Sequence, residues 1–426
     1  MTLVFLRCKR IAWKGLFLGI FLLLGHQCTF LIIRGPMATL PVAMNDPAPN
    51  VFLPELPPTD KTSSLCTSIT SVQELETFLP NHTTNQTTNW DKIWKVPGIL
   101  NSSSTTTIFP EKYLNQSTCF FFATPQSKHF PHAMQQLYRC WSYWRRYPES
   151  TPVLVGPSHH RGFRPTVRPD FFTNMLHALQ TAIGLHVVAM NYSTISELDD
   201  VMETHGIRSV RSTFEHGDGF ALASSHDAVE LRNAILGNRT NDKRRDWQTG
   251  CPLLVSERLP RIALLNRDEK QSQRSFLNAI EVAQAITDNG LSSEVPIIYF
   301  ENATFVEQIQ FFNNVDIVLS PHGAQLTSMA FLPSCGGVLE FFPRGYFVPY
   351  YFGSLARAAG LRYTALYLSE NRDDWEKETR EATRSVQSRF RIRQSNLCPS
   401  VDDVVRLVRK MVSHWTDCCA RIVSRS

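Results

Sequence analysis

Residues 315–325 read VDIVLSPHGAQ, an apolar run that passes into a polar turn. The run predicts a buried strand over Val315–Leu319, and the segment after the turn predicts a helix over Ala324–Phe331. The flanking segments repeat this alternation of apolar strands and helices. Such alternation is typical of parallel β-α-β units whose sheet is covered on both faces. The stretch therefore predicts an α/β fold.

The second half of the chain extends the pattern. Strands are expected at Arg261–Leu265, Val295–Phe300, Gly337–Phe341 and Tyr363–Leu368. Helices are expected at Ser272–Thr287, from Thr304 to about Phe312, at Tyr350–Ala359 and at Ser400–Ile422. Capping-box patterns open two of these helices, Thr304 with Glu307 and Ser400 with Asp403.

The first half carries a weaker version of the pattern. Helices are expected at Pro131–Trp144 and Pro169–Ile183, and strands at Pro152–Val155 and Leu185–Met190. Two such halves, joined by a linker near Asn238–Gly250, predict two Rossmann-like domains. The expected divisions are residues 116–250, residues 251–395 and a C-terminal helix in residues 396–426.

The net charge is confined to the N-terminus. The chain has 43 Lys and Arg against 38 Asp and Glu, a net charge of +5. Residues 1–45 contain no acidic residue and five basic ones: Arg7, Lys9, Arg10, Lys14 and Arg34. Residues 46–426 therefore balance to zero, which argues against a nucleic-acid partner because such a partner needs a basic surface on the folded part.

A nineteen-residue apolar segment, Gly15–Ile33, follows most of these basic residues. Its length fits a helix that crosses a bilayer, and the charge asymmetry keeps the N-terminus cytoplasmic. We therefore expect residues 1–34 to be a cytoplasmic tail and signal anchor, with the rest of the chain lumenal. A cleaved signal peptide is the alternative, but no small-x-small cleavage site follows the apolar run.

Residues 35–115 have the composition of a flexible stem. They contain 10 of the 25 prolines and several runs of Asn, Ser and Thr. A segment of this composition buries too little apolar surface to compensate for the conformational entropy that it would lose on folding. A short helix at Ser71–Phe78 is the one element expected there.

Two further patterns agree with a lumenal location. Asn-x-Ser/Thr acceptor sites occur at Asn81, Asn85, Asn101, Asn115, Asn191, Asn238 and Asn302. Eight cysteines follow the apolar segment, an even number suited to disulfides in an oxidising compartment, although their pairing stays open. No spacing typical of a zinc site is present, so no metal is expected.

A longer pattern surrounds the opening stretch. It comprises residues 315–327, then Phe331-Leu332-Pro333 and then GVLEFFP at residues 337–343. This block resembles the signature of glycosyltransferase family 61, which includes secretory-pathway O-linked N-acetylglucosaminyltransferases and plant β-1,2-xylosyltransferases. Two upstream segments are also similar to the family, Asn266-Arg267 with Arg274 and Asn278, and KHFPH at residues 128–132. The resemblance covers residues 119–370.

The resemblance implies a GT-B-like fold and an inverting transferase that uses a nucleotide sugar, with neither metal nor cofactor. The sequence agrees in having no Asp-x-Asp pair, the usual metal-diphosphate ligand of the other large transferase architecture. The charge on a leaving UDP must then be met by arginines and helix N-terminal amides. The implied donor-binding residues are Arg267, Arg274, His322, Gly323, Ala324, Gln325 and Glu340.

Several of these residues also have a structural interpretation. Arg267 and Arg274 can be surface charges beside a helix, but Arg267 ends a strand at the ligand side, which favours donor binding. Glu340 either contacts the sugar or ribose or is paired with an arginine, because an unpaired carboxylate in an apolar strand is unfavourable. His132 is the candidate general base, since imidazole titrates near neutral pH, and capping the following helix is its alternative role.

We therefore expect a type II membrane glycosyltransferase of the Golgi or endoplasmic reticulum. It would transfer N-acetylglucosamine or xylose from a UDP donor to a glycoprotein or glycan acceptor with inversion. The alternative is a catalytically silent lumenal protein of the same fold that binds glycans or serves as a scaffold.

Overall fold

The structure is a computed structural model of the chain. It describes residues 72–75, 116–121, 129–157, 169–190, 209–212, 219–237, 251, 258–269, 273–368, 375–382 and 384–424. These residues all belong to one compact unit, Glu55–Ser426. The expected signal anchor and most of the expected stem lie outside them. Among the described residues, no helix has both the length and the apolar character that crossing a bilayer requires.

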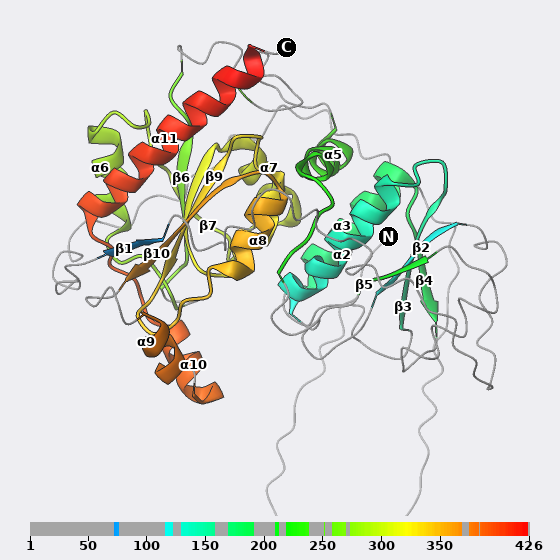
Figure 1. Cartoon of the computed structure of the whole chain (residues 1–426), viewed down its shortest axis with the longest axis horizontal. Coiled ribbons are helices and arrows are strands. Elements are labelled where there is room, and N and C mark those ends of the chain that lie inside the picture. The colour runs from blue at the N-terminus through cyan, green and yellow to red at the C-terminus, as the bar shows by residue number, and fades with distance from the viewer. Residues whose placement is uncertain are drawn as a thin grey trace, which may run out of the picture. The chain divides into compact units, whose positions relative to one another are not determined.

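A six-stranded sheet combines the strands of the second half with one edge strand from residues 72–75 (Figure 1). Its strands run in the order β1 (Val72–Leu75), β10 (Arg362–Leu368), β9 (Gly337–Phe342), β8 (Ile317–Pro321), β6 (Ile262–Asn266) and β7 (Ile297–Tyr299). Neighbours pair in parallel except β1, which pairs antiparallel with β10. The predicted parallel sheet is thus confirmed, and each predicted strand lies within two residues of its observed bounds.

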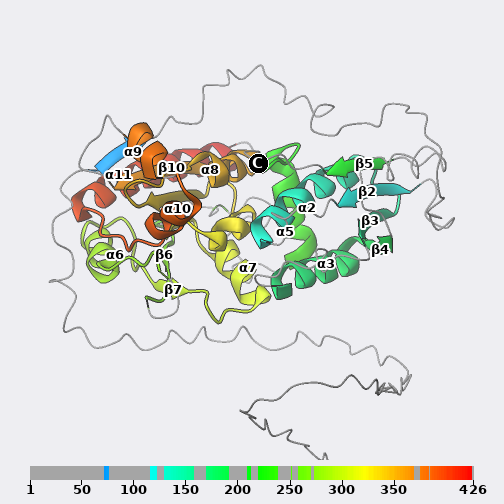
Figure 2. The ribbon, with the colours of Figure 1, turned by 90° about the horizontal axis from the view of Figure 1, so that it is seen from below.

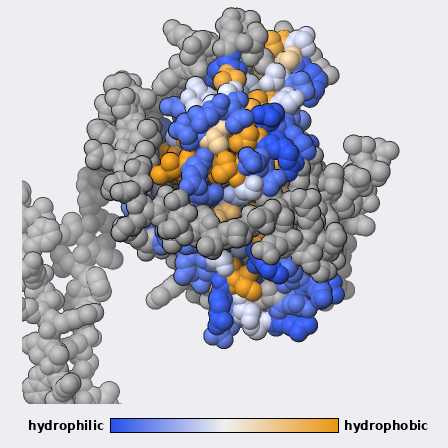
Figure 3. Space-filling view, turned by 90° about the vertical axis from the view of Figure 1, so that its left-hand side faces the viewer, coloured by the Kyte–Doolittle hydropathy of each residue, from blue (hydrophilic) through white to orange (hydrophobic). Residues whose placement is uncertain are grey.

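Helices cover both faces of this sheet. The helices on one face are α6 (Ala279–Asp288) and α11 (Val401–Val423), and those on the other are η5 (Ala324–Phe331), α7 (Phe305–Asn314) and α8 (Tyr350–Ala358). Alternate residues of β6 point to opposite faces of the sheet. Ile262 and Leu264 pack in the core beneath α6 and α11, whereas Ala263 and Leu265 pack in the core beneath η5, α7 and α8. Figure 3 views the side of α6 and α11, where the described side chains are mostly hydrophilic with small apolar patches between them.

The first half contains a four-stranded parallel sheet. Its order is β4 (His186–Met190), β3 (Pro152–Pro157), β2 (Ser117–Phe121) and β5 (Ser209–Ser212). The helices that accompany it are α2 (Phe130–Arg145), α3 (Pro169–Ile183) and α5 (Ser225–Leu236) (Figure 2). The four elements predicted in this half, α2, β3, α3 and β4, are confirmed, whereas β2, β5 and α5 were not predicted.

A continuous apolar core joins the two halves. It runs from α2, α3 and α5 to η5, α7 and α8. Two buried hydrogen bonds reinforce it, because the Tyr138 hydroxyl donates to the Thr327 carbonyl at 2.8 Å and Arg232 Nη1 donates to the Leu332 carbonyl at 3.0 Å. The expected domain boundaries stay predictions.

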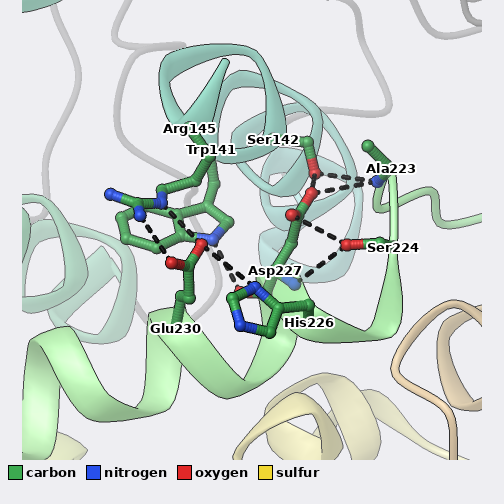
Figure 4. A network of polar contacts seen from close by, with 8 residues as sticks. All are labelled: Trp141, Ser142, Arg145, Ala223, Ser224, His226, Asp227 and Glu230. Carbon is green, nitrogen blue, oxygen red and sulfur yellow. Dashed lines mark hydrogen bonds and ion pairs between the residues drawn. The ribbon is translucent and has the colours of Figure 1, made fainter. Parts of the chain in front are cut away.

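A buried carboxylate fastens α5 to α2 (Figure 4). Asp227 accepts hydrogen bonds from the hydroxyl of Ser142, from that of Ser224 at 3.0 Å and from the backbone N–H of Ala223 at 3.2 Å. The indole N–H of Trp141 donates to the backbone carbonyl of Asp227 at 2.7 Å. These donors satisfy the carboxylate locally and fix the start of α5 against α2.

Disulfides fix other parts of the fold. Three of them join described residues, Cys119–Cys140, Cys251–Cys419 and Cys335–Cys418, and Cys398 is disulfide-bonded as well. The first ties β2 to α2, and the other two tie the end of α11 to earlier segments. The predicted use of disulfides is therefore confirmed. Asn302, the acceptor site that falls among the described residues, is exposed.

Two local predictions are wrong. The short helix expected at Ser71–Phe78, within the predicted stem, is instead strand β1, because backbone pairing with the edge of β10 outweighs the local helical pattern. The helix expected from Ser272 begins only at Ala279, since the preceding residues bond to distant segments. The helix predicted over Ala324–Phe331 is confirmed with the same bounds, and it is a 3₁₀ helix.

Candidate active site

The strands that carry the predicted donor residues meet where the strand order reverses. From β6 the chain passes to β7 on one side and then, through α7, to β8 on the other side of β6. In open parallel sheets, ligands bind beyond the carboxyl ends of the strands at such a switch point. Arg267 directly follows β6, and His322 and Gly323 directly follow β8. The fold therefore places these three residues at the expected ligand edge.

Arg274 reaches the same edge through an irregular segment before α6. Asn266 Oδ1 accepts from the N–H of Phe276 at 2.8 Å, and Asn396 Oδ1 accepts from the N–H of Arg274 at 3.2 Å. Arg274 has a φ of 76°, a left-handed conformation that is uncommon outside glycine. Its buried side chain donates from Nη1 to the carbonyl of His322 at 2.7 Å. These bonds hold its guanidinium beside the turn after β8.

Gly323 lies where two guanidinium groups converge. A Cβ at this position would stand 3.0 Å from Arg267 Nη1 and 3.6 Å from Arg274 Nη1. Gly323 is also the N-cap of η5, so the N–H groups of the first helical turn begin directly after it. A side chain here would occupy the space between the guanidiniums and the backbone. Two cations and a helix start around a glycine suit the binding of a phosphate.

Behind this turn, His322 and Glu340 form a buried pair. His322 Nδ1 lies 2.7 Å from Glu340 Oε1, and the hydroxyl of Tyr363 donates to Glu340 Oε2 at 2.5 Å. Glu340 lies in β9 with 0% of its surface exposed, and its neighbour Tyr363 lies in β10. The carboxyl group is thus paired, but with a histidine and a tyrosine rather than with an arginine.

Burial favours the neutral form of both members of this pair. It raises the pKa of Glu340 to about 8 and, together with the charge of Arg274, lowers the pKa of His322 well below its usual range. Burial and the charges of Arg267 and Arg393 also lower the pKa of Arg274 to about 9, which leaves Arg274 cationic at neutral pH. The positive charge at this edge therefore comes from the arginines.

Aromatic rings enclose His322. Phe342 stacks on its imidazole with centroids 5.0 Å apart, and Tyr346 and Phe352 lie at 5.3 and 5.5 Å. The hydroxyl of Tyr346 is 3.5 Å from His322 Nε2. With Glu340 at Nδ1 and three rings around it, the imidazole is held in one orientation.

Gln325 and Ala324 occupy the start of η5. Gln325 Nε2 donates to the carbonyl of Leu265 at 3.0 Å and to Ser320 Oγ at 2.7 Å. These bonds tie the turn after β8 to the end of β6, so Gln325 supports the shape of the site. Ala324 is the first residue of η5. Contact of either residue with a donor stays a prediction.

His132, the candidate base, lies on α2 in the first half. The N-cap of α2 is His129, so the capping role considered for His132 is wrong. His132 Nδ1 lies 2.7 Å from Gln135 Oε1 and 3.0 Å from the hydroxyl of Tyr351 on α8. Because an amide oxygen only accepts, Nδ1 carries the proton and Nε2 is the basic nitrogen.

An aromatic cluster joins the two histidines. Tyr351 meets His132 edge to face at 5.4 Å, and the next residue, Phe352, lies 5.5 Å from His322. Phe220 packs against Tyr351 at 5.2 Å and against Phe352 at 5.8 Å. Helix α8 thus places one ring against each histidine and brings both into one assembly.

Sequence reasoning missed several side chains of this assembly. Tyr363 lies inside an apolar strand, where it resembles an ordinary core residue, and Tyr346 and Tyr351 stand outside any motif. Arginines of α10 (Val386–Arg393) were missed as well, although its sequence, VQSRFRIR, has a high density of arginine. That density was the one signal available.

Within the described residues, a single group of three potential metal ligands occurs, Cys251, Cys335 and Cys419, with ligand atoms within 4.8 Å of one another. All three are half-cystines. Disulfide sulfurs are not the thiolates that bind metals. This group therefore serves the fold at the end of α11.

Comparison with known proteins adds a family to this geometry. The family model described as glycosyltransferase 61 matches residues 122–339, just over half of the chain. A β-1,2-xylosyltransferase of Oryza sativa subsp. japonica is 32% identical over 195 residues. That match covers 44% of this chain and 30% of the relative, so the chain spans less than a third of the relative's length. The family match includes His132, Arg267, Arg274 and His322, and ends one residue before Glu340.

Proposed function

We propose a sugar-transfer function for this chain, which belongs to glycosyltransferase family 61. In this proposal the two parallel sheets form a GT-B-like pair, and a UDP-sugar binds at the reversal of strand order in the second half. The observation that carries it is the convergence of Arg267 and Arg274 on Gly323. Arginines bind phosphate oxygens in pairs of parallel hydrogen bonds, which suits a diphosphate.

The proposed reaction is a single displacement. The acceptor hydroxyl oxygen attacks the anomeric carbon, the bond from that carbon to the UDP oxygen breaks, and the configuration inverts. His132 Nε2 takes the hydroxyl proton, while Arg267 and Arg274 stabilise the negative charge that develops on the leaving UDP. In this scheme the arginines take the role that a divalent ion has in other transferases, so neither metal nor cofactor is needed.

The transferred sugar is xylose or N-acetylglucosamine, and the acceptor is a glycoprotein or its glycan. The rice relative is named as a β-1,2-xylosyltransferase, which supports xylose as the transferred sugar. The support comes from a match that covers 44% of this chain.

We further propose that the protein is a single-pass type II membrane protein of the Golgi or endoplasmic reticulum, with the catalytic part lumenal. The basic N-terminus, the apolar segment Gly15–Ile33, the exposed acceptor Asn302 and the disulfides all support this location.

A donor panel tests the proposal. The full-length chain, purified in mild detergent, is mixed with UDP-xylose or UDP-N-acetylglucosamine, glycoprotein acceptors and EDTA, and the release of UDP is measured. We expect acceptor-dependent release with one donor and the same rate with or without EDTA. Loss of activity in EDTA contradicts the metal-free scheme. Binding of UDP without any transfer identifies the catalytically silent alternative.

A further inference from the structure

Helix α10 packs against the ring cluster that surrounds His322. Its sequence contains three arginines, Arg389, Arg391 and Arg393, and no acidic residue. Its partly buried Ile392 lies against a small core that includes Phe342 and Tyr346. Both of these aromatic residues contact the imidazole of His322. The helix is therefore attached to the site already described.

Arg389 lies one ring away from His322. Its guanidinium carbon is 5.8 Å from the centre of the Tyr346 ring, a cation–π geometry. Tyr346 in turn lies 5.3 Å from His322, with its hydroxyl 3.5 Å from Nε2. The Tyr346 ring thus contacts both the Arg389 guanidinium and the imidazole of His322.

The chain after α10 brings Arg393 toward Arg274. Asn396, three residues beyond Arg393, accepts from the N–H groups of Arg274 and Ser275 at 3.2 and 3.1 Å. Leu397 N–H donates to the Ser275 carbonyl at 2.8 Å. The charge of Arg393 is close enough to lower the pKa values of both Arg274 and His322, after burial as the main cause.

Among the described residues, the charges that lower the pKa of His322 come from four arginines. The guanidiniums of Arg267, Arg274, Arg389 and Arg393 all act on its imidazole. The carboxyl group of Glu340 already bonds to His322 and to Tyr363, and burial raises its pKa to about 8. Four cations beside a largely neutral carboxyl favour a ligand with several negative charges, such as a diphosphate, over a singly charged one.

We propose that Arg389 and Arg393 complete the phosphate site begun by Arg267 and Arg274, and that the four arginines select a nucleoside diphosphate over a monophosphate. This inference rests on the proposed function, since it deepens the account of the same donor site. Arg267 and Arg274 hold one phosphate at Gly323, and α10 supplies charge for the second. Helix α10 thereby determines specificity for the diphosphate, although it lies outside the sequence segments that resemble the family signature.

Matched variants test this inference. Arg384 and Arg391 are exposed arginines in or beside α10, and neither is among the charges that act on His322 or Arg274. The double variant R384Q/R391Q therefore removes the same charge as R389Q/R393Q but from another position. Titration calorimetry of the full-length chain in EDTA measures the affinities of UDP and UMP, and thermal unfolding checks that each variant is folded.

We expect the wild type to bind UDP more tightly than UMP. R389Q/R393Q should weaken UDP binding by at least about tenfold, the size of one lost charge-assisted hydrogen bond, and bring the UDP/UMP ratio toward one. The control should stay within about twofold of the wild type. Equal weakening in both double variants, or none in R389Q/R393Q, overturns the inference and leaves the proposed function standing. Absence of UDP binding in the wild type overturns both. If R389Q/R393Q unfolds, the single variants R389Q and R393Q decide in the same way.

Discussion

Two buried carboxyl groups in this molecule show how a scaffold differs from a site. Asp227 accepts from serine hydroxyls and a backbone N–H, donors that do not titrate near neutral pH, and it fastens one helix to another (Figure 4). Glu340 bonds to His322 and Tyr363, and it lies near the cationic Arg274. Burial alone does not distinguish them. Their surroundings do, because the partners of Asp227 join one helix to another, whereas the partners of Glu340 belong to a cluster beside arginines that can bind an anion.

The largest effect on activity is expected for His132, the proposed general base, which lies on α2 in the first half. His132→Ala should lower kcat by about 10²- to 10⁴-fold, the usual contribution of a general base. Affinity for UDP should stay unchanged, because His132 lies on α2 and not at the donor edge. Steady-state transfer assays with parallel UDP titrations measure both quantities. A near wild-type kcat would remove His132 from the chemistry.

Arg274→Ala should lower kcat/KM by about 100- to 1000-fold, because it removes a donor aimed at the developing charge. Arg344→Ala is the matched control, since Arg344 is largely exposed and forms a surface ion pair with Glu378. Equal activity of the two variants would show that the charge near Glu340 has no part in binding, and Glu340 would then resemble Asp227.

Asp227→Ala tests the scaffold side of the comparison. The change leaves the hydroxyls of Ser142 and Ser224 without their acceptor, so the free energy of unfolding should fall by about 2–4 kcal/mol. The activity per folded molecule should be unchanged. Urea unfolding and transfer assays on the folded fraction measure these effects. A loss of kcat in folded protein would mean that Asp227 belongs to the site as well.

Glu340→Gln tests the protonation of the buried pair. Burial raises the pKa of Glu340 in the folded protein to about 8, above its pKa in the unfolded chain. The folded protein therefore holds this proton more tightly, and the resulting stabilisation is complete below the pKa of the unfolded chain. It is lost as the pH rises toward about 8. Gln stays neutral while still offering a donor to His322 and an acceptor to Tyr363. The difference in unfolding free energy should therefore move in favour of the variant between about pH 5 and pH 8. A difference independent of pH would show that Glu340 is ionised throughout.

The smallest effect is expected at a helix cap outside both networks. Thr304 accepts from the N–H of Glu307, whose carboxylate accepts from the N–H of Thr304 at 2.7 Å. Thr304→Ala should lower the free energy of unfolding by about 1 kcal/mol, the usual value of such a cap, without changing transfer activity. Thermal unfolding measures this shift. A change in kcat would show that α7 influences the site.

Local patterns predicted most of the second half of the fold. A short, continuous apolar run such as the one in Arg261–Leu265 is typical of a strand that is buried on both faces of a parallel sheet, and β6 is such a strand. The capping box at Thr304 is also present as predicted. The errors lie where distant partners decide. Residues 72–75 form a strand because the edge of β10 pairs with them, and Arg274 stays outside a helix because Asn266 and Asn396 hold its neighbourhood.

The donor edge was predictable for a related reason. Arg267, His322 and Gly323 immediately follow strands that were predicted to be parallel, and the carboxyl ends of parallel strands lie at the same edge of a sheet. Tyr363 and the arginines of α10 reach His322 only through packing that has no local signature. Their roles follow from three-dimensional contacts, which a single sequence does not contain.

The central claim is that the edge around Gly323 binds a nucleoside diphosphate without a metal. The most direct test is calorimetric titration of UDP into the full-length chain in EDTA, with wild type and Gly323→Val compared. The valine would place a side chain 3.0 Å from Arg267 Nη1 and fill the space between the two guanidiniums. We predict binding of one UDP by the wild type and at least about tenfold weaker binding by the folded variant, the loss of one charge-assisted hydrogen bond or more. Equal affinity of the two proteins, or no binding by the wild type, would contradict the account.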